Sequence, residues 1–153
     1  GRADRVPGGE PLVLAYIANG GVLVGSGDGK VLIDALFDKP NPEYRAPAPE
    51  ILEKMMKGEA PFDGVDIVLV THNHPDHFDA GLAARYLDAV SGPVLMAPSD
   101  AVEAMRKAAA DWAKLDPRVI ALDVEVGGAR RARRRASGST PSARSTAATA
   151  KSR

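Results

Sequence analysis

Three histidines and one aspartate lie within six consecutive positions, and the chain contains no other histidine. They are His72, His74, Asp76 and His77. Imidazole nitrogens and carboxylate oxygens both ligate transition metals, and the chain has no cysteine that could do so. The cluster therefore predicts a metal site built from histidine and carboxylate.

The spacing inside this cluster suggests two metal positions. His72 and His74 are two residues apart, so in extended backbone their side chains point the same way and can bind one ion. Asp76 and His77 follow Pro75, and the bend that proline favours can turn them toward a second ion. We expect a paired-metal site. A mononuclear or structural site, or a solvated loop without metal, is the alternative.

An apolar stretch directly precedes the cluster. Residues 66–71, with the sequence DIVLVT, predict a buried strand, and the polar cluster begins where its apolar run ends. In α/β proteins, ligands gather at the edge of the sheet where the parallel strands end. This position favours a functional site.

The first third of the chain predicts an antiparallel meander. Strands are expected at 12–17, 22–24 and 30–34, with turns at Asn19-Gly20-Gly21 and at residues 26–29. A proline-rich loop follows, so a helix can run only from Pro49 to about Gly58.

The region after the cluster predicts alternating helices and strands. The helix at 82–90 and the strand at 94–96 complete a βαβ unit with the strand before the cluster. A second helix is expected from Ser99 or Asp100 to about Leu115, with Trp112 in the core, followed by a strand at 119–126.

The segment Thr71-His72-Asn73-His74-Pro75-Asp76-His77 resembles the H-x-H-x-D-H signature of the metallo-β-lactamase superfamily. The strands before it agree, because that family has a Leu-Ile-Asp-like strand end, matched here by Val31-Leu32-Ile33-Asp34. The resemblance covers about residues 12–126. It implies an α/β chain forming the N-terminal half of the αββα sandwich of that family.

The resemblance also implies roles for single residues. His72 and His74 would ligate a first zinc ion, and Asp76 and His77 a second. A metal-bound hydroxide would attack an ester, lactone, amide or phosphodiester, because bound Zn²⁺ lowers the pKa of water to about 7. Asp76 would also act as the catalytic acid that protonates the leaving group.

Three further polar residues have two interpretations each. Asp34 and Thr71 would orient imidazoles by hydrogen bonds, or they are ordinary polar residues at strand ends. Asp79 follows Phe78 as in the branch of the family that contains lactonases and phospholipid phosphodiesterases, or it caps the helix at 82–90.

The second half of the family's ligand set has no counterpart here. Family members add later histidines and a bridging aspartate, whereas this chain has no histidine after His77. We therefore expect a partial domain with weak or no hydrolase activity. The alternative is a catalytically inactive binding or regulatory module that keeps the fold.

Charge divides the chain into two parts. Residues 127–153 carry eight basic and no acidic side chains, which leaves residues 1–126 with 12 basic and 20 acidic ones. Residues 128–153 also contain no Val, Ile, Leu, Met or aromatic side chain, so we expect a disordered, basic, low-complexity tail. This tail is either native sequence or the product of a shifted reading frame.

We thus expect three regions: an extension at 1–11, the partial domain at 12–126 and the tail at 127–153. No apolar run is long enough to span a bilayer, so the chain should be soluble, with its compartment undetermined. The expected partner is a small-molecule substrate, and Arg130–Arg135 could alternatively engage nucleic acid or an anionic surface.

Overall fold

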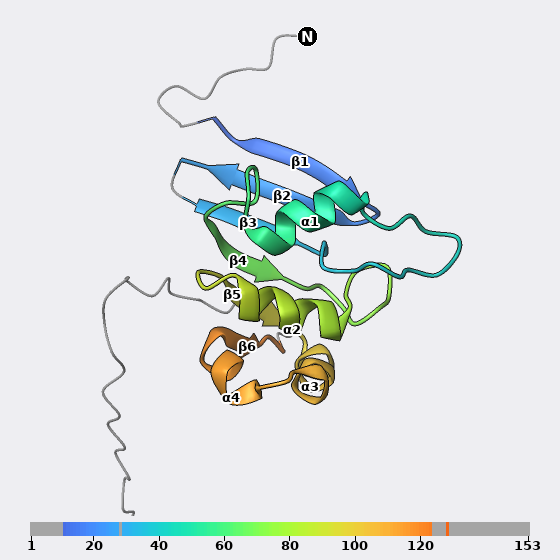
Figure 1. Ribbon diagram of the computed structural model, residues 1–153, viewed down its shortest axis with the longest axis vertical. Coiled ribbons are helices and arrows are strands. Elements are labelled where there is room, and N and C mark those ends of the chain that lie inside the picture. The colour runs from blue at the N-terminus through green and yellow to red at the C-terminus, as the bar shows by residue number, and fades with distance from the viewer. Residues whose placement is uncertain (1–10, 28, 124–127, 129–153) are drawn as a thin grey trace, which may run out of the picture.

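The computed structural model describes residues 11–27, 29–123 and 128, and shows a mixed α/β fold with one six-stranded sheet (Figure 1). Each strand lies beside its neighbour in the sequence, in the order β1-β2-β3-β4-β5-β6. The strands are β1 (Val13–Ala18), β2 (Gly21–Ser26), β3 (Gly29–Ile33), β4 (Val65–Leu69), β5 (Val94–Ala97) and β6 (Val119–Ala121). The helices are α1 (Pro49–Lys57), α2 (Ala80–Ala89), α3 (Ser99–Ala108) and α4 (Trp112–Leu115).

The predicted meander is confirmed, since β1, β2 and β3 pair antiparallel. The turn between β1 and β2 contains Asn19, whose φ of 49° lies in the left-handed region that Asn tolerates better than most residues. A sheet built from hairpins in this way needs only short connections.

From β3 onward the sheet is parallel, and helices make the crossovers. β3 pairs with β4 across α1, and β4 pairs with β5 across α2. The helix α1 begins at Pro49 and is capped at its C-terminus by Gly58, which has a φ of 63°, as the sequence predicts. The predicted βαβ unit is also present.

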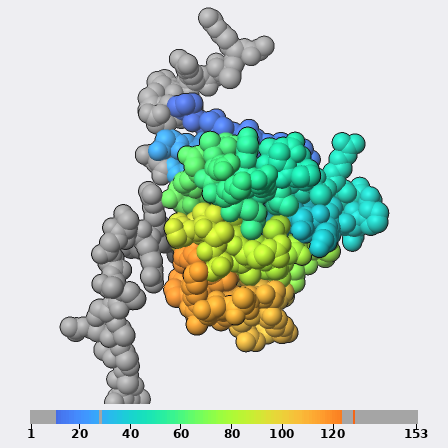
Figure 2. Space-filling model, viewed as in Figure 1, coloured from blue at the N-terminus to red at the C-terminus, as the bar shows by residue number. Residues whose placement is uncertain are grey.

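The helices bury one face of the sheet. Leu23, Leu32, Val68 and Leu95 are paired across β2 to β5, and all four are buried in the core cluster. Figure 1 shows α1 and α2 lying in front of the strands, and Figure 2 shows the surface that they form, with the loop between β3 and α1 extending from one side.

The opposite face of the sheet is more open. Leu14 and Tyr16 on β1 are 67% and 72% exposed, and the residues that continue this face on β2 and β3 are only half-buried. Alternation along each strand produces this difference, because neighbouring side chains point to opposite faces. Most of the core therefore lies between the helices and the face of the sheet that they cover.

The helix expected from residue 99 to 115 begins at Ser99 as predicted, but it does not run unbroken to Leu115. It is divided into α3 and α4, because Ala109 is extended and the Asp111 carboxylate accepts from the Lys114 amide at 3.4 Å to begin a new helix. At its start, the Ser99 amide donates to the Asp123 carboxylate at 3.1 Å.

Three other expectations concern the end of the domain. Trp112 packs against the core but stays partly exposed. The last strand was predicted to reach residue 126, whereas β6 ends at Ala121, and residues 124–126 lie outside the described part of the chain. The predicted disordered tail lies outside it as well, apart from residue 128.

Within the described residues, no helix is long and apolar enough to cross a membrane.

Candidate metal centre

Two parallel strands place the polar cluster at one edge of the sheet. Asp34 follows the end of β3, and Thr71 comes shortly after the end of β4. The Asp34 amide donates to the Leu69 carbonyl at 3.0 Å, which ties the two strand ends together. The site therefore lies where the parallel strands end, as predicted.

The loop after β4 coils into a tight turn. The amides of His77 and Phe78 both donate to the His74 carbonyl, at 3.0 and 2.9 Å, and the His74 amide donates to the His72 carbonyl at 3.2 Å. This turn spans Pro75, where the sequence predicts a bend. It brings residues at both ends of the signature close to one another.

The far end of this loop is anchored in the core. Phe78 is 3% exposed and forms a parallel bridge with Leu36, and the Asp79 amide donates to the Leu36 carbonyl at 2.8 Å. The Asp79 carboxylate accepts from the Leu82 amide at 2.6 Å, so Asp79 caps α2 as its second interpretation predicts. The loop is thus held at both ends.

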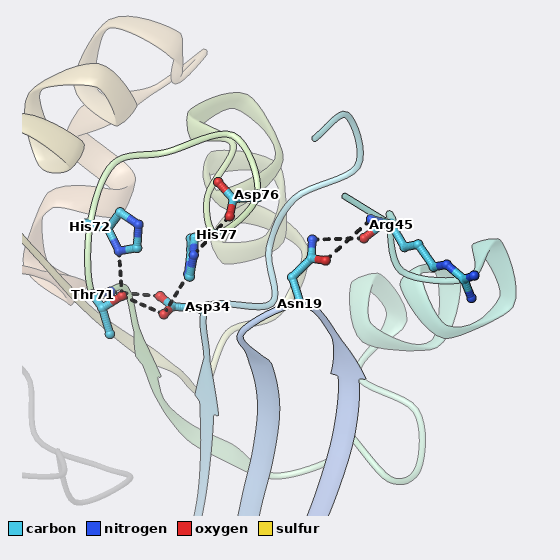
Figure 3. A network of polar contacts seen from close by, with 7 residues as sticks. All are labelled: Asn19, Asp34, Arg45, Thr71, His72, Asp76 and His77. Carbon is cyan, nitrogen blue, oxygen red and sulfur yellow. Dashed lines mark hydrogen bonds and ion pairs between the residues drawn. The ribbon is translucent and has the colours of Figure 1, made fainter. Parts of the chain in front are cut away.

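Asp34 is the most constrained residue of the site. Its side chain is buried and its φ of 45° lies in the left-handed region. One carboxylate oxygen accepts from the Thr71 amide at 2.8 Å, and the other accepts from the Thr71 hydroxyl at 2.6 Å and contacts Nδ1 of His77 at 3.0 Å (Figure 3). Backbone strain of this kind persists only where surrounding contacts hold it, and it clusters at functional sites.

These contacts assign the proton on two imidazoles. Because the Thr71 hydroxyl gives its only hydrogen to Asp34, it must accept one from Nδ1 of His72, 2.9 Å away. Nδ1 of His77 likewise carries a hydrogen toward the Asp34 carboxylate. The nitrogen that can bind a metal is therefore Nε2 on both rings.

The side chains of the signature gather on one side of Asp34. The ring centroid of His72 lies 3.9 Å from that of His77 and 4.6 Å from that of His74. One carboxylate oxygen of Asp76 lies 3.1 Å from Nε2 of His77. All four residues that the sequence singles out as ligands are thus neighbours in a loop of six residues.

The tightest group of possible ligands differs slightly from the predicted pairs. Asp34, His72 and His77 each offer a ligand atom, and these atoms lie within 4.8 Å of one another. His74 is exposed and stands outside this group of three. The assignment of each residue to a particular ion stays a prediction.

Gly20 is a neighbour of the site that the sequence analysis did not identify. A Cβ atom added to Gly20 would lie 2.8 Å from Cε1 and 3.1 Å from Nδ1 of His77. In the sequence, Gly20 is explained by the turn between β1 and β2. No sequence pattern indicates its contact with His77, because Gly20 and His77 are 57 positions apart.

A family model described as the metallo-beta-lactamase superfamily matches residues 17–143 of the chain. The match includes the whole signature, the strand end at Asp34 and the turn at Gly20. No curated protein matches the chain.

Proposed function

The chain belongs to the metallo-beta-lactamase superfamily, and from this premise we propose that it is a zinc-dependent hydrolase. The proposed ligands are His72, His74, Asp76 and His77. The observation that carries the proposal is the hydrogen-bonded unit of Asp34 and Thr71, which leaves Nε2 as the ligating nitrogen on two adjacent imidazoles. Ligating histidines in metalloproteins are held in this way by carboxylates.

The donor atoms also fit a cation. With the hydrogen of His77 on Nδ1, its Nε2 lone pair faces a carboxylate oxygen of Asp76 at 3.1 Å. Two electron-rich atoms at that separation repel each other unless a proton or a metal ion accompanies them. Nitrogen and oxygen ligands of this kind suit Zn²⁺.

Zinc, when bound, would supply Lewis acidity and a nucleophilic water at neutral pH. The residues of the chain would orient the ligands and transfer the proton. Asp34 and Thr71 orient two imidazoles, and Asp76, within the turn, is proposed to deliver a proton to the oxygen of the leaving group. The proposed substrates are esters, lactones or phosphodiesters, in which that oxygen is the leaving atom.

Metal binding and turnover test this proposal. Zinc stoichiometry and affinity would be measured by calorimetry on the full chain, and hydrolysis with bis-p-nitrophenyl phosphate and a simple γ-lactone. We expect zinc to bind and at least one substrate to be hydrolysed slowly, because the chain has no histidine after His77 to complete the family's ligand set. Asp76→Asn should lower turnover of the lactone by about 100-fold or more, because it removes a proposed zinc ligand and the group that protonates the leaving oxygen, and general acid catalysis alone contributes about 10²–10⁴-fold.

The matched control is Asp63→Asn. Asp63 precedes β4, so it lies at the end of that strand opposite the site, where it pairs with Lys30 at 3.0 Å. This substitution should change neither zinc binding nor turnover. Less than one equivalent of zinc and no turnover would instead favour the inactive binding module, which is the second candidate because the chain has only three histidines.

A further inference from the structure

We propose that Gly20 is a positioning residue for His77, and that its lack of a side chain creates the space in which the imidazole must sit to contact Asp34. The position of the ring depends on the fold alone. The consequence for zinc affinity rests on the function proposed above.

The contact between Gly20 and His77 is too close for any side chain. A Cβ on Gly20 would lie 2.8 Å from Cε1 of His77. This is well below the distance of about 3.5–4.0 Å at which two carbon atoms attract each other, so the two atoms would repel. The same Cβ would lie 3.8 Å from a carboxylate oxygen of Asp34. A substitution at Gly20 therefore meets the imidazole first, on the edge between its two nitrogens.

Three neighbours hold the imidazole in its present position. Its Nδ1 contacts Asp34 at 3.0 Å, its Nε2 contacts Asp76 at 3.1 Å, and the His72 ring lies 3.9 Å away between centroids. Only 18% of the His77 side chain is exposed. Any displacement large enough to relieve the contact with Gly20 must lengthen the hydrogen bond to Asp34.

The turn that carries Gly20 is fixed as well. The Asn19 side chain exchanges two hydrogen bonds with the backbone of Arg45, at 3.0 and 3.4 Å (Figure 3). On the other side, a Cβ on Gly21 would lie 2.8 Å from the Ala18 carbonyl and 2.9 Å from the Asp34 carbonyl, so the backbone is packed closely there. The ring, rather than the turn, is the part that moves.

Gly20 also suits a clean substitution. Gly20 lacks the positive φ of Gly58 and Gly64, so alanine at position 20 introduces no left-handed strain. The matched control is Gly92→Ala, because a Cβ there would meet its nearest atom, the Val65 carbonyl oxygen, at an ordinary 3.8 Å. Any difference between the two variants then reports the contact with His77.

The first measurement needs no metal. Long-range ¹H–¹⁵N spectra at one fixed pH report the ring nitrogens of His77 in the metal-free protein. We expect Gly20→Ala to shift the Nδ1 and Nε2 resonances of His77, because the hydrogen bond to Asp34 is lengthened, and Gly92→Ala to leave them in place. Unchanged His77 resonances in folded Gly20→Ala protein would overturn the proposal.

The second measurement is a double-substitution cycle with His77→Ala, which removes the ring that Gly20 touches. Gly20→Ala alone should lower the midpoint of urea unfolding, and in the His77→Ala background it should have no further effect. An equal loss in both backgrounds would mean that alanine perturbs the turn itself, and the proposal would be wrong. This unfolding measurement does not depend on whether any of the variants binds metal.

Zinc affinity separates this inference from the proposed function. If wild-type protein binds zinc, Gly20→Ala should weaken binding by about 10–100-fold, as loss of an orienting hydrogen bond does in other metal sites, and Gly92→Ala should not. Equal affinity in wild type and Gly20→Ala would overturn the consequence for zinc. Wild-type protein that binds no zinc while Gly20→Ala still shifts the His77 resonances would overturn the proposed function and uphold the positioning role.

Discussion

The carboxylate of Asp34 contacts Nδ1 of His77 at 3.0 Å, although 43 positions separate the two residues in the sequence. The contact forms because β3 and β4 are parallel neighbours and the loop after β4 turns back over the end of β3. The orientation of the His77 ring therefore depends on the pairing of these two strands.

Asp34→Asn should weaken zinc binding by about 10–100-fold, the range found when a partner of a ligating histidine is removed. An amide presents one oxygen and one NH₂ group, so it cannot accept from the Thr71 amide, the Thr71 hydroxyl and His77 together. The unfolding free energy should also fall by about 1–3 kcal/mol, because a buried donor is left unpaired. Calorimetry with zinc and urea unfolding measure the two effects.

Asp34→Ala distinguishes the carboxylate from the backbone. Asn tolerates the φ of 45° at this position, whereas Ala does so less readily. Asp34→Ala should consequently be less stable than Asp34→Asn while binding zinc no better. Wild-type zinc affinity in either variant would contradict the orienting role of Asp34.

Tyr86→Phe should leave the unfolding free energy unchanged or raise it by up to about 1 kcal/mol. The Tyr86 hydroxyl is buried in the core and has no hydrogen-bond partner within the described part of the chain. Removing an unsatisfied buried group relieves its desolvation cost. Urea unfolding near pH 8 checks this, with Tyr86→Ala as a contrasting variant that should lose about 3–5 kcal/mol through the cavity it leaves.

The same tyrosine should make the protein less stable in alkali. Burial raises the pKa of Tyr86 from its ordinary value of 10 to about 12, and the positive charge of Arg118 offsets part of that rise. Between these two values the unfolded chain loses the proton and the folded chain keeps it. The Tyr86 contribution to stability should therefore fall by about 1.4 kcal/mol per pH unit from pH 10 to 12.

Unfolding measured at pH 8 and pH 11 in wild type and Tyr86→Phe tests this dependence. The stability advantage of Tyr86→Phe over wild type should grow by about 1.4 kcal/mol between the two pH values. An advantage that stays constant would show that Tyr86 does not titrate differently in the folded and unfolded chain.

Arg118→Lys should destabilise the protein by about 1–2 kcal/mol. The Arg118 guanidinium donates to the carbonyls of Leu87, Val90 and Pro93, which lie where α2 ends and β5 begins. A single ammonium cannot reproduce this planar fork. As a control, Arg106→Lys alters an exposed pair with Glu103 and should change stability by less than about 0.5 kcal/mol.

The two faces of the sheet should respond differently to the same substitution. Leu23→Ala, on the face covered by helices, should lower the unfolding free energy by about 2–5 kcal/mol, as expected for a buried leucine. Leu14→Ala, on the open face of the neighbouring strand, should lower it by less than about 1 kcal/mol. Equal losses would mean that the open face is covered in solution.

Local patterns explain why much of the fold could be predicted. Asn19-Gly20-Gly21, the apolar run of β4 and the pair of Pro49 and Gly58 each specify a turn, a strand or a helix within a few residues. The signature itself is a local pattern, so the loop that bears the histidines was also predictable. These features depend on neighbours in the sequence alone.

Features that depend on tertiary contacts were harder to predict. The break between α3 and α4 has no proline or glycine to mark it, and Asp123 satisfies the start of α3 from 24 positions away. The proximity of Gly20 to His77 likewise arises only when the first hairpin packs beside the loop after β4. Residue type alone does not specify close contacts between residues that are far apart in the sequence.

The compactness of the signature has a consequence for thermal stability. Because His72, His74 and His77 lie within six residues, an unfolded chain still presents them together, whereas Asp34 joins them only in the folded state. Zinc would thus bind both states and stabilise the fold only by the difference between the two affinities. The rise in melting temperature on adding zinc then measures what Asp34 and the packed loop contribute to ligation, beyond what a short histidine-rich peptide achieves.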